Sequence, residues 1–280
     1  RGPLPALDLS DTGAPSPAEL RELAEATEAA ALAVMGVTNS QGGSASAGRT
    51  VVALATSHGF AGSYETTSHG LSASVVAGEG AAMQRDYAWR SAHHRADLPG
   101  AAEIGLLAGE RAVGRLNPGR LASGPLPVVF DPRVGGTLIG HLISAMSGAA
   151  IARGASFLLG RDGEQVFGAD ITIIDDPLRP RGLRSKPFDG EGLPTARRVL
   201  VENGRLTGWL MNAAAARQLG GRPTGHATRG GGAPGIGATN THVAAGTQSP
   251  ADLIADIADG VYVTELIGQG VNGVTDQFGH

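Results

Sequence analysis

Two pairs of carboxylates are the residues of this chain best placed to do chemistry. Asp175 and Asp176 end an apolar run just before a proline, and Asp189 and Glu191 lie in a loop punctuated by glycines. Paired carboxylates can act as general acid and base, and carboxylate oxygens are the ligands that Mg²⁺ and Ca²⁺ prefer. The sequence therefore leaves open a hydrolytic centre that uses a carboxylate-bound metal.

Both pairs also have a structural interpretation, which we favour. Asp175 and Asp176 can cap a turn by accepting hydrogen bonds from backbone N–H groups. Asp189 and Glu191 can brace the glycine loop. The arginines that stand close to that loop in the sequence, and can serve as its partners, are Arg184, Arg197 and Arg198.

Histidines supply a second set of candidate ligands. His58 and His69 are expected near strand ends and can approach each other, but no carboxylate stands at a ligand spacing beside them. His93 and His94 are adjacent, so their side chains should point to opposite faces of a strand as a solvated pair. Neither pair predicts a metal site. The glycine-rich run 230–237 lacks the Lys-Ser/Thr and the following helix of a phosphate-binding loop.

The composition predicts a folded protein with neither a nucleic-acid nor a membrane partner. The 280 residues are 41% hydrophobic, include 44 glycines and no cysteine, and carry a formal net charge of -4. No basic cluster offers an electrostatic footprint for nucleic acid, and no run of about eighteen apolar residues could span a membrane. Without cysteine, disulfides and thiolate metal ligands are excluded. No signal peptide is evident, and we expect a cytoplasmic protein.

The elements that must position these residues are short strands and a few helices. The periodicity and a capping box at Ser16 and Glu19 predict helices over residues 17–35, 99–116, from 132 onward, 213–218 and 249–259. Strands are predicted over residues 49–57, 63–77, 80–91, 126–130 and 171–174. Asn203-Gly204 predicts a type I′ hairpin turn between residues 199–201 and 206–210.

This order of elements predicts the fold class and a division of the chain. Most connections are short hairpins and nothing alternates like a parallel βαβ sheet, so we predict an α+β fold with large, mostly antiparallel sheets and a few packed helices. Residues 1–125 should form the end of an N-terminal or central α+β region with an antiparallel meander. Residues 126–280 should form a C-terminal β-rich domain.

The stretch from Ser185 to Gly230 resembles the TldD/PmbA family. Members of that family carry an acidic glycine loop that ends in Pro-Thr, an Asn-Gly hairpin and a Thr-Gly-Asn/His segment, in this order. Further matches run along nearly the whole chain, at residues 36–40, 83–87, 155–158, 175–177 and 268–272. The resemblance implies a PmbA/TldD-like fold. It also implies that the chain is a fragment lacking the family's N-terminal α/β domain and its C-terminal end.

The zinc motif of the TldD branch of this family is degenerate in this chain. That branch carries His-Glu-x-x-x-His in the helix that follows a short buried strand, together with a late cysteine. Aligned on His141, the motif has Gly136 in place of the first His and Thr137 in place of the Glu. One imidazole supplies neither a chelate nor a general base. The resemblance thus places the chain in the TldE (PmbA) branch, with Gly136, Thr137 and His141 facing the expected cleft.

The resemblance implies a non-catalytic subunit of a cytoplasmic TldD/TldE zinc metallopeptidase that acts on unfolded or flexible peptides. This chain would hold no metal, cofactor or catalytic residue, and the zinc would belong to a TldD-like partner in a heterodimer. Sheet edges and glycine loops could receive an extended peptide by strand addition, with contacts from Asp175, Asp176, Asp189 and Glu191. Two alternatives are a homodimeric hydrolase with a carboxylate-bound metal, and a non-enzymatic modulator of a protein such as DNA gyrase.

Overall fold

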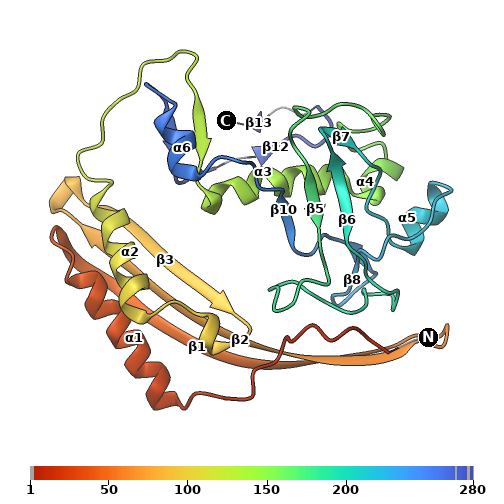
Figure 1. The fold of residues 1–280 in the computed structure, drawn as a ribbon, viewed down its shortest axis with the longest axis horizontal. Helices are drawn as coiled ribbons and strands as arrows, with labels where there is room; N and C mark the ends of the chain where they lie inside the picture. The colour runs from red at the N-terminus through yellow and green to blue at the C-terminus, as the bar shows by residue number, and fades with distance from the viewer. Residues whose placement is uncertain (1–2, 269, 276–277, 280) are drawn as a thin grey trace.

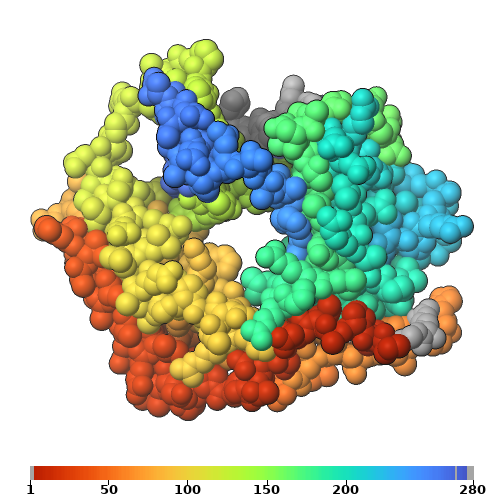
Figure 2. Space-filling model, viewed as in Figure 1, coloured from red at the N-terminus to blue at the C-terminus, as the bar shows by residue number. Residues whose placement is uncertain are grey.

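The computed structural model describes residues 3–268, 270–275 and 278–279 and divides the chain into two halves. Figure 1 shows a long β-hairpin lying against two helices in the N-terminal half, and a smaller antiparallel sheet in the C-terminal half. Figure 2 shows a hole between the halves, which we call the central opening. It is bordered by β10, by the loop 176–197 and by the yellow part of the N-terminal half.

Helices account for a minority of the described residues. The α-helices are α1 (Pro17–Leu32), α2 (Ala101–Val113), α3 (Pro132–Ala145), α4 (Gly148–Ala152), α5 (Ala213–Gln218) and α6 (Pro250–Ala255), and the 3₁₀ helices are η1 (Gly80–Ala82) and η2 (Arg95–Asp97). None of these helices combines the length and the apolar character needed to cross a membrane.

The strands form one three-stranded sheet, one four-stranded sheet and three isolated pairs. They are β1 (Val37–Ala55), β2 (Ala61–Ala77), β3 (Gln84–Ala92), β4 (Val128–Phe130), β5 (Ile173–Asp175), β6 (Arg198–Glu202), β7 (Arg205–Leu206), β8 (Ala227–Thr228), β9 (Gly235–Ile236), β10 (Thr241–Val243), β11 (Val261–Val263), β12 (Gly270–Val271) and β13 (Phe278–Gly279). Among the pairings of these strands, that of β4 with β11 is parallel and the others are antiparallel.

The N-terminal half buries one face of the sheet β1-β2-β3 under α1 and α2. Alternate residues of β2 point to this face, because side chains alternate across a strand. The buried residues that form the core are Ala31, Leu71, Ala73, Val75, Ala77, Ala88, Ile104, Ala108 and Ala112. The two helices touch closely at Gly105, where a Cβ atom would lie 2.2 Å from the Thr27 carbonyl oxygen.

The C-terminal half has its own core between α3 and the sheet ordered β10-β5-β6-β7. Its buried residues are Leu142, Ala145, Met146, Leu158, Ile173, Leu200, Val201, Leu206 and Leu210. Asn203 and Gly204 have φ angles of 49° and 78° and connect β6 to β7. Positive φ at both central residues is what a type I′ turn requires, so the hairpin predicted at Asn203-Gly204 is confirmed.

The predicted fold class is confirmed, while several boundaries were wrong. The first strand begins at Val37 instead of residue 49, because Gly42 and Gly43 lie within β1 rather than before it. A Cβ atom on Gly43 would lie 2.2 Å from the carbonyl oxygen of Ala24, so glycine lets α1 approach the strand. The capping box at Ser16 is present, but α1 ends at Leu32.

The short strand predicted over residues 126–130 is not buried as expected. It forms β4, in which Val128 and Phe130 are 48% and 40% exposed. The reason is that β4 pairs only with β11, in a two-stranded ribbon outside both cores.

A network around Asp86 joins the two halves above the central opening, and we call it the upper junction. Arg133 of α3 donates to Asp86 over 2.8 Å, and Arg115 donates to it over 3.2 Å and also pairs with Glu265. Asp86 is 3% exposed and Arg133 is 13% exposed. Burial raises the pKa of Asp86, but the hydrogen bonds from Arg133, the Tyr87 N–H and Arg115 outweigh it and hold that pKa below its usual value.

Asp86→Asn should lower the free energy of unfolding at pH 7 by about 2–3 kcal/mol, because two arginines lose a charged acceptor. Since the pKa of Asp86 is lowered in the folded protein, its contribution is present above about pH 4 and is lost as the pH falls further. Urea denaturation at pH 7 and pH 3 measures both effects. Glu110→Gln, on the exposed face of α2, is the control and should change stability by less than about 0.5 kcal/mol. Equal stability of the two variants would contradict the assignment.

Candidate functional site

The free edge of β10 is the part of the central opening most suited to bind another chain. β10 is the first strand of the order β10-β5-β6-β7 and, among the described strands, pairs only with β5. The Asn240 carbonyl accepts from the Asp176 N–H over 3.2 Å, and the Ala244 N–H donates to the Thr172 carbonyl over 2.8 Å. Backbone groups alternate in direction along an antiparallel strand. The N–H and C=O groups of Thr241 and Val243 therefore point away from β5, toward the opening (Figure 1).

The buried carboxylate of Asp175 fixes β10 in place. It accepts from the Thr239 N–H over 2.7 Å, the Thr239 hydroxyl over 2.8 Å and the Thr241 hydroxyl over 2.9 Å. Nε2 of His226 lies 3.3 Å from its other side. Burial raises the pKa of Asp175, but the hydrogen bonds from His226, Thr239 and Thr241 outweigh burial and lower it. The lowered pKa favours the ionised carboxylate, and three protein donors already bond to it.

Asp176, Asp189 and Glu191 also accept backbone hydrogen bonds. Asp176 caps a turn by accepting the Leu178 N–H over 3.0 Å. Asp189 accepts hydrogen bonds from the N–H groups of Glu191 (2.9 Å), Leu193 (2.9 Å) and Ala227 (3.1 Å). Glu191 accepts one from the Ala213 N–H (2.8 Å). Asp189 thus braces the glycine loop and Glu191 holds the start of α5.

The partners of these carboxylates differ from the arginines that the sequence suggested. No ion pair joins Asp189 or Glu191 to an arginine within the described residues. Arg184 instead donates its backbone N–H to Asn240, and Arg198 reaches the Thr207 carbonyl. Across residues 3–268, 270–275 and 278–279, no three His, Asp or Glu side chains converge in a way that could hold a metal ion. The geometry of the carboxylate pairs therefore favours the structural interpretation.

The degenerate motif lies on α3, which begins after the cap residue Asp131 and crosses above the central opening in Figure 1. Val134 and Leu142 are buried, whereas Gly136 and Thr137 are exposed and His141 is half-buried. A Cβ atom on Gly136 would meet no other atom within 4 Å. The packing of this chain thus places no demand on the residue type at that position.

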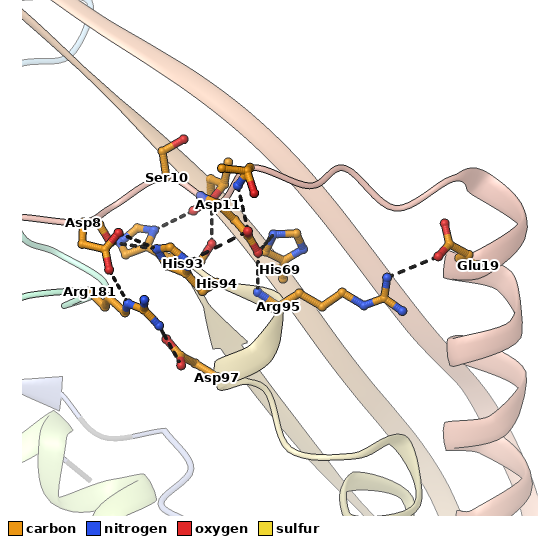
Figure 3. A network of polar contacts seen from close by, with 12 residues as sticks. Asp8, Ser10, Asp11, Glu19, His69, His93, His94, Arg95, Asp97 and Arg181 are labelled. Atoms are coloured by element: carbon orange, nitrogen blue, oxygen red, sulfur yellow. Dashed lines mark hydrogen bonds and ion pairs between the residues drawn. The ribbon is translucent and has the colours of Figure 1, made fainter.

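A second polar network, the lower junction, joins the N-terminal segment and the end of β3 to the loop 176–197 and was missed in the sequence (Figure 3). Arg181 donates to Asp8 over 2.6 Å and to both carboxylate oxygens of Asp97 over 3.1 Å. His93 and His94, which the sequence predicted to be a solvated pair, belong to it. The side chain of His94 is 13% exposed and lies 3.2 Å from an Asp8 oxygen, and His93 is 7% exposed. The two histidines are sequestered because the N-terminal segment covers them.

The expectation that His69 lies near a strand end is wrong, and the possible approach of His58 to His69 does not occur. His58 lies in the turn beyond β1, whereas His69 pairs with Ala47 and Ala92 in the middle of the sheet. About eight residues of strand separate His69 from the turn, or roughly 26 Å. His69 is 4% exposed and lies 3.6 Å from Asp11, a carboxylate distant in the sequence. The missed signal is the alternation in residues 7–9, where Leu7 and Leu9 are buried on either side of Asp8.

Comparison with known proteins identifies two domains of one family. Residues 10–116 match the PmbA/TldA metallopeptidase central domain, and residues 123–279 match the PmbA/TldA metallopeptidase C-terminal domain. Metalloprotease PmbA of Escherichia coli O157:H7 is 37% identical over 98% of this chain and 59% of its own length. The Metalloprotease PmbA homolog of Haemophilus influenzae is 35% identical over 92% of this chain and 56% of its own length. The chain thus spans less than two thirds of these relatives.

Solved structures show the same fold. A crystal structure from Bacteroides thetaiotaomicron, of a protein named as a modulator of DNA gyrase, matches with a TM-score of 0.90 at 28% identity. It covers 99% of this chain and 62% of that one. TldE from Thermococcus kodakarensis matches with a TM-score of 0.83 at 25% identity, over 98% of this chain and 62% of that one.

Gly136→Ala should raise the free energy of unfolding by about 0.5–1 kcal/mol, because alanine is the better helix former and its methyl group meets no neighbour. Gly105→Ala is the matched helical control and should destabilise, since its methyl group would overlap the Thr27 carbonyl. Thermal and urea denaturation measure both. A destabilised Gly136→Ala would show that the position is packed after all.

Proposed function

The chain belongs to the PmbA/TldA metallopeptidase family, and on that basis we propose that it is a TldE-type, non-catalytic subunit of a cytoplasmic peptidase complex. In this role it binds an extended peptide at the free edge of β10. The zinc ion, the general base and the attacking water belong to a TldD-like partner that faces the same opening.

The observation that carries the proposal is the free edge of β10 on the central opening. The N–H and C=O groups of Thr241 and Val243 are aligned for four hydrogen bonds to a peptide. Each such bond contributes about 0.5–1.5 kcal/mol net. Backbone recognition of this kind accepts many sequences but requires an extended segment. Folded proteins rarely offer one, so the substrates are unfolded or flexible peptides.

The residues of this chain do not fit the zinc ion that the family name implies. His141 is a single imidazole on α3, with Gly136 and Thr137 where a second ligand and a base would stand. No convergent set of three ligand-type side chains exists in the part of the chain that the structure describes. We therefore assign no metal-dependent step to this chain. Its contribution is to bind the peptide and to shape the opening.

Measurements of metal content and peptide hydrolysis test whether the zinc and the cleavage belong to the partner and not to this chain. The purified protein alone should contain no stoichiometric zinc and cleave no peptide. Zinc and cleavage should appear when it is mixed one-to-one with the TldD-like protein of the same organism. Stoichiometric metal and cleavage by this chain alone would falsify the proposal. In that case Asp189→Asn and Glu191→Gln, with the fold intact, would test the stand-alone hydrolase.

Val243→Pro should weaken peptide binding about two- to tenfold, because proline removes one N–H from the free edge and with it one hydrogen bond. Proline is tolerated on an edge strand where the N–H faces solvent, so the melting temperature should change little. Fluorescence anisotropy with an unstructured labelled peptide measures the affinity.

His242→Pro is the matched control for this experiment. By the same alternation, the His242 N–H points toward β5, so proline there should break the ladder and lower stability. Unchanged peptide affinity in a folded Val243→Pro protein would show that peptides bind elsewhere.

A second candidate function is a non-enzymatic, protein-binding modulator. The name of the Bacteroides thetaiotaomicron structure, a modulator of DNA gyrase, favours this alternative. Co-precipitation from cells distinguishes the two functions. Recovery of gyrase without any TldD-like protein would favour the modulator, whereas recovery of a TldD-like protein supports the peptidase subunit.

A further inference from the structure

Both ring nitrogens of His93 face carbonyl oxygens. Nδ1 lies 2.6 Å from the Thr67 carbonyl oxygen and Nε2 lies 3.1 Å from the Gly182 carbonyl oxygen. A carbonyl oxygen can only accept a hydrogen bond, and a neutral imidazole has a single N–H to donate. Both contacts are hydrogen bonds only when the ring is protonated on both nitrogens.

From this geometry we infer that His93, as an imidazolium, is a proton-dependent clasp that holds the loop 176–197 against the N-terminal sheet. Thr67 belongs to β2 and Gly182 to that loop, so the two hydrogen bonds connect the halves of the protein. His93 is 7% exposed. Water therefore has little access to replace a hydrogen bond that the ring fails to make.

The clasp is connected to the peptide-binding edge through Asn240, the residue before β10. The side chain of Asn240 accepts the Arg184 N–H over 2.9 Å and donates to the Ser185 hydroxyl over 2.7 Å. Arg184 and Ser185 follow Gly182 closely in the same loop. Release of Gly182 thus loosens the segment that adjoins the free edge of β10. This consequence rests on the proposed function, whereas the clasp itself does not.

His93 lies at a junction that holds both acidic and basic groups. The titratable and charged groups there include Asp8 and Asp11 of the N-terminal segment, His69 of β2, His94, Arg95 and Asp97 after β3, and Arg181 of the loop 176–197 (Figure 3).

Two of these carboxylates stay ionised where histidine titrates. The hydrogen bond from Arg181 lowers the pKa of Asp8, and the hydrogen bond from the Arg95 N–H lowers that of Asp11. Histidine usually changes its charge between about pH 5 and 8.

Loss of one proton from His93 removes one of the two hydrogen bonds and leaves a ring lone pair facing a carbonyl oxygen. The bond to Gly182 is the longer of the two and is the one we expect to break. Protonation and closure are therefore linked, with the clasp closed at low pH and loosened as the pH rises.

Two measurements on the unmodified protein test the clasp. Nitrogen-15 NMR of the histidine rings should show both His93 nitrogens protonated at pH 5.5 or below, with a loss of one proton on titration upward. Hydrogen exchange, corrected for the intrinsic effect of pH, should show protection at residues 181–185 falling by about tenfold or more over the same titration. A neutral His93 ring throughout, or protection that is independent of pH, would overturn the inference.

Variants separate His93 from its neighbours. His93→Gln is uncharged at every pH and should abolish the pH dependence of protection at residues 181–185. His94→Gln, one residue away, and His58→Gln, in the exposed turn beyond β1, should keep it. If the pH dependence survives in His93→Gln and disappears in His94→Gln, the assignment of the clasp to His93 is wrong. If peptide binding fails but the titration behaves as described, the proposed function fails and the clasp stands.

Discussion

The two halves of this protein have separate cores and meet at two polar junctions and at one aromatic contact, in which Phe188 packs against Phe60 and Tyr64. The buried residues of the N-terminal core and those of the C-terminal core form separate clusters with no member in common. Apolar burial is non-directional and would draw the halves together over any available surface. Here the apolar contact between the halves is confined to the rings of Phe188, Phe60 and Tyr64, and ion pairs at Asp86 and at Arg181 connect the halves on either side of the central opening. The directional ion pairs therefore contribute to the shape of the opening.

Directional contacts also determine the edge of the C-terminal sheet. A strand edge with unpaired N–H and C=O groups invites pairing with another chain, and proteins usually block it. Here Asp175 bonds to Thr239 and Thr241, so β10 is held in place although no other strand within the described residues pairs with its outer edge. An edge that is ordered in advance has already lost its conformational freedom, which lowers the cost of binding a peptide. A buried, fully bonded carboxylate is thus of more use to this surface as a positioning group than as a catalyst.

The sequence correctly predicted those features that depend on residues close together in the chain. The turn at Asn203-Gly204 and the helix cap at Ser16 depend on residues within a few positions, and both formed as expected. The start of β1 was wrong because Gly43 resembles a turn residue, and only its contact with Ala24 of α1 makes it a strand residue. The α+β class was predictable because short hairpins dominate the chain.

The candidate site depends on contacts between residues far apart in the chain, and so it could be predicted only in part. The sequence singled out Asp175 and Asp189, but it did not reveal that Asp175 meets Thr239 across 64 residues or that His93 meets Gly182 across 89. No local pattern specifies such partners.

The degenerate motif shows where fold and function are independent in this family. Gly136 and Thr137 point away from the core, and α3 is held instead by Val134, Leu142 and the ion pair of Arg133. Glycine costs a helix interior about 1 kcal/mol relative to alanine, and α3 carries Gly135, Gly136 and Gly140 with no neighbour near their Cβ positions. Packing within this chain therefore neither requires these glycines nor excludes larger residues. The identity of residues 135, 136 and 140 is thus left open by the packing of α3, so the fold by itself does not decide what chemistry this helix performs.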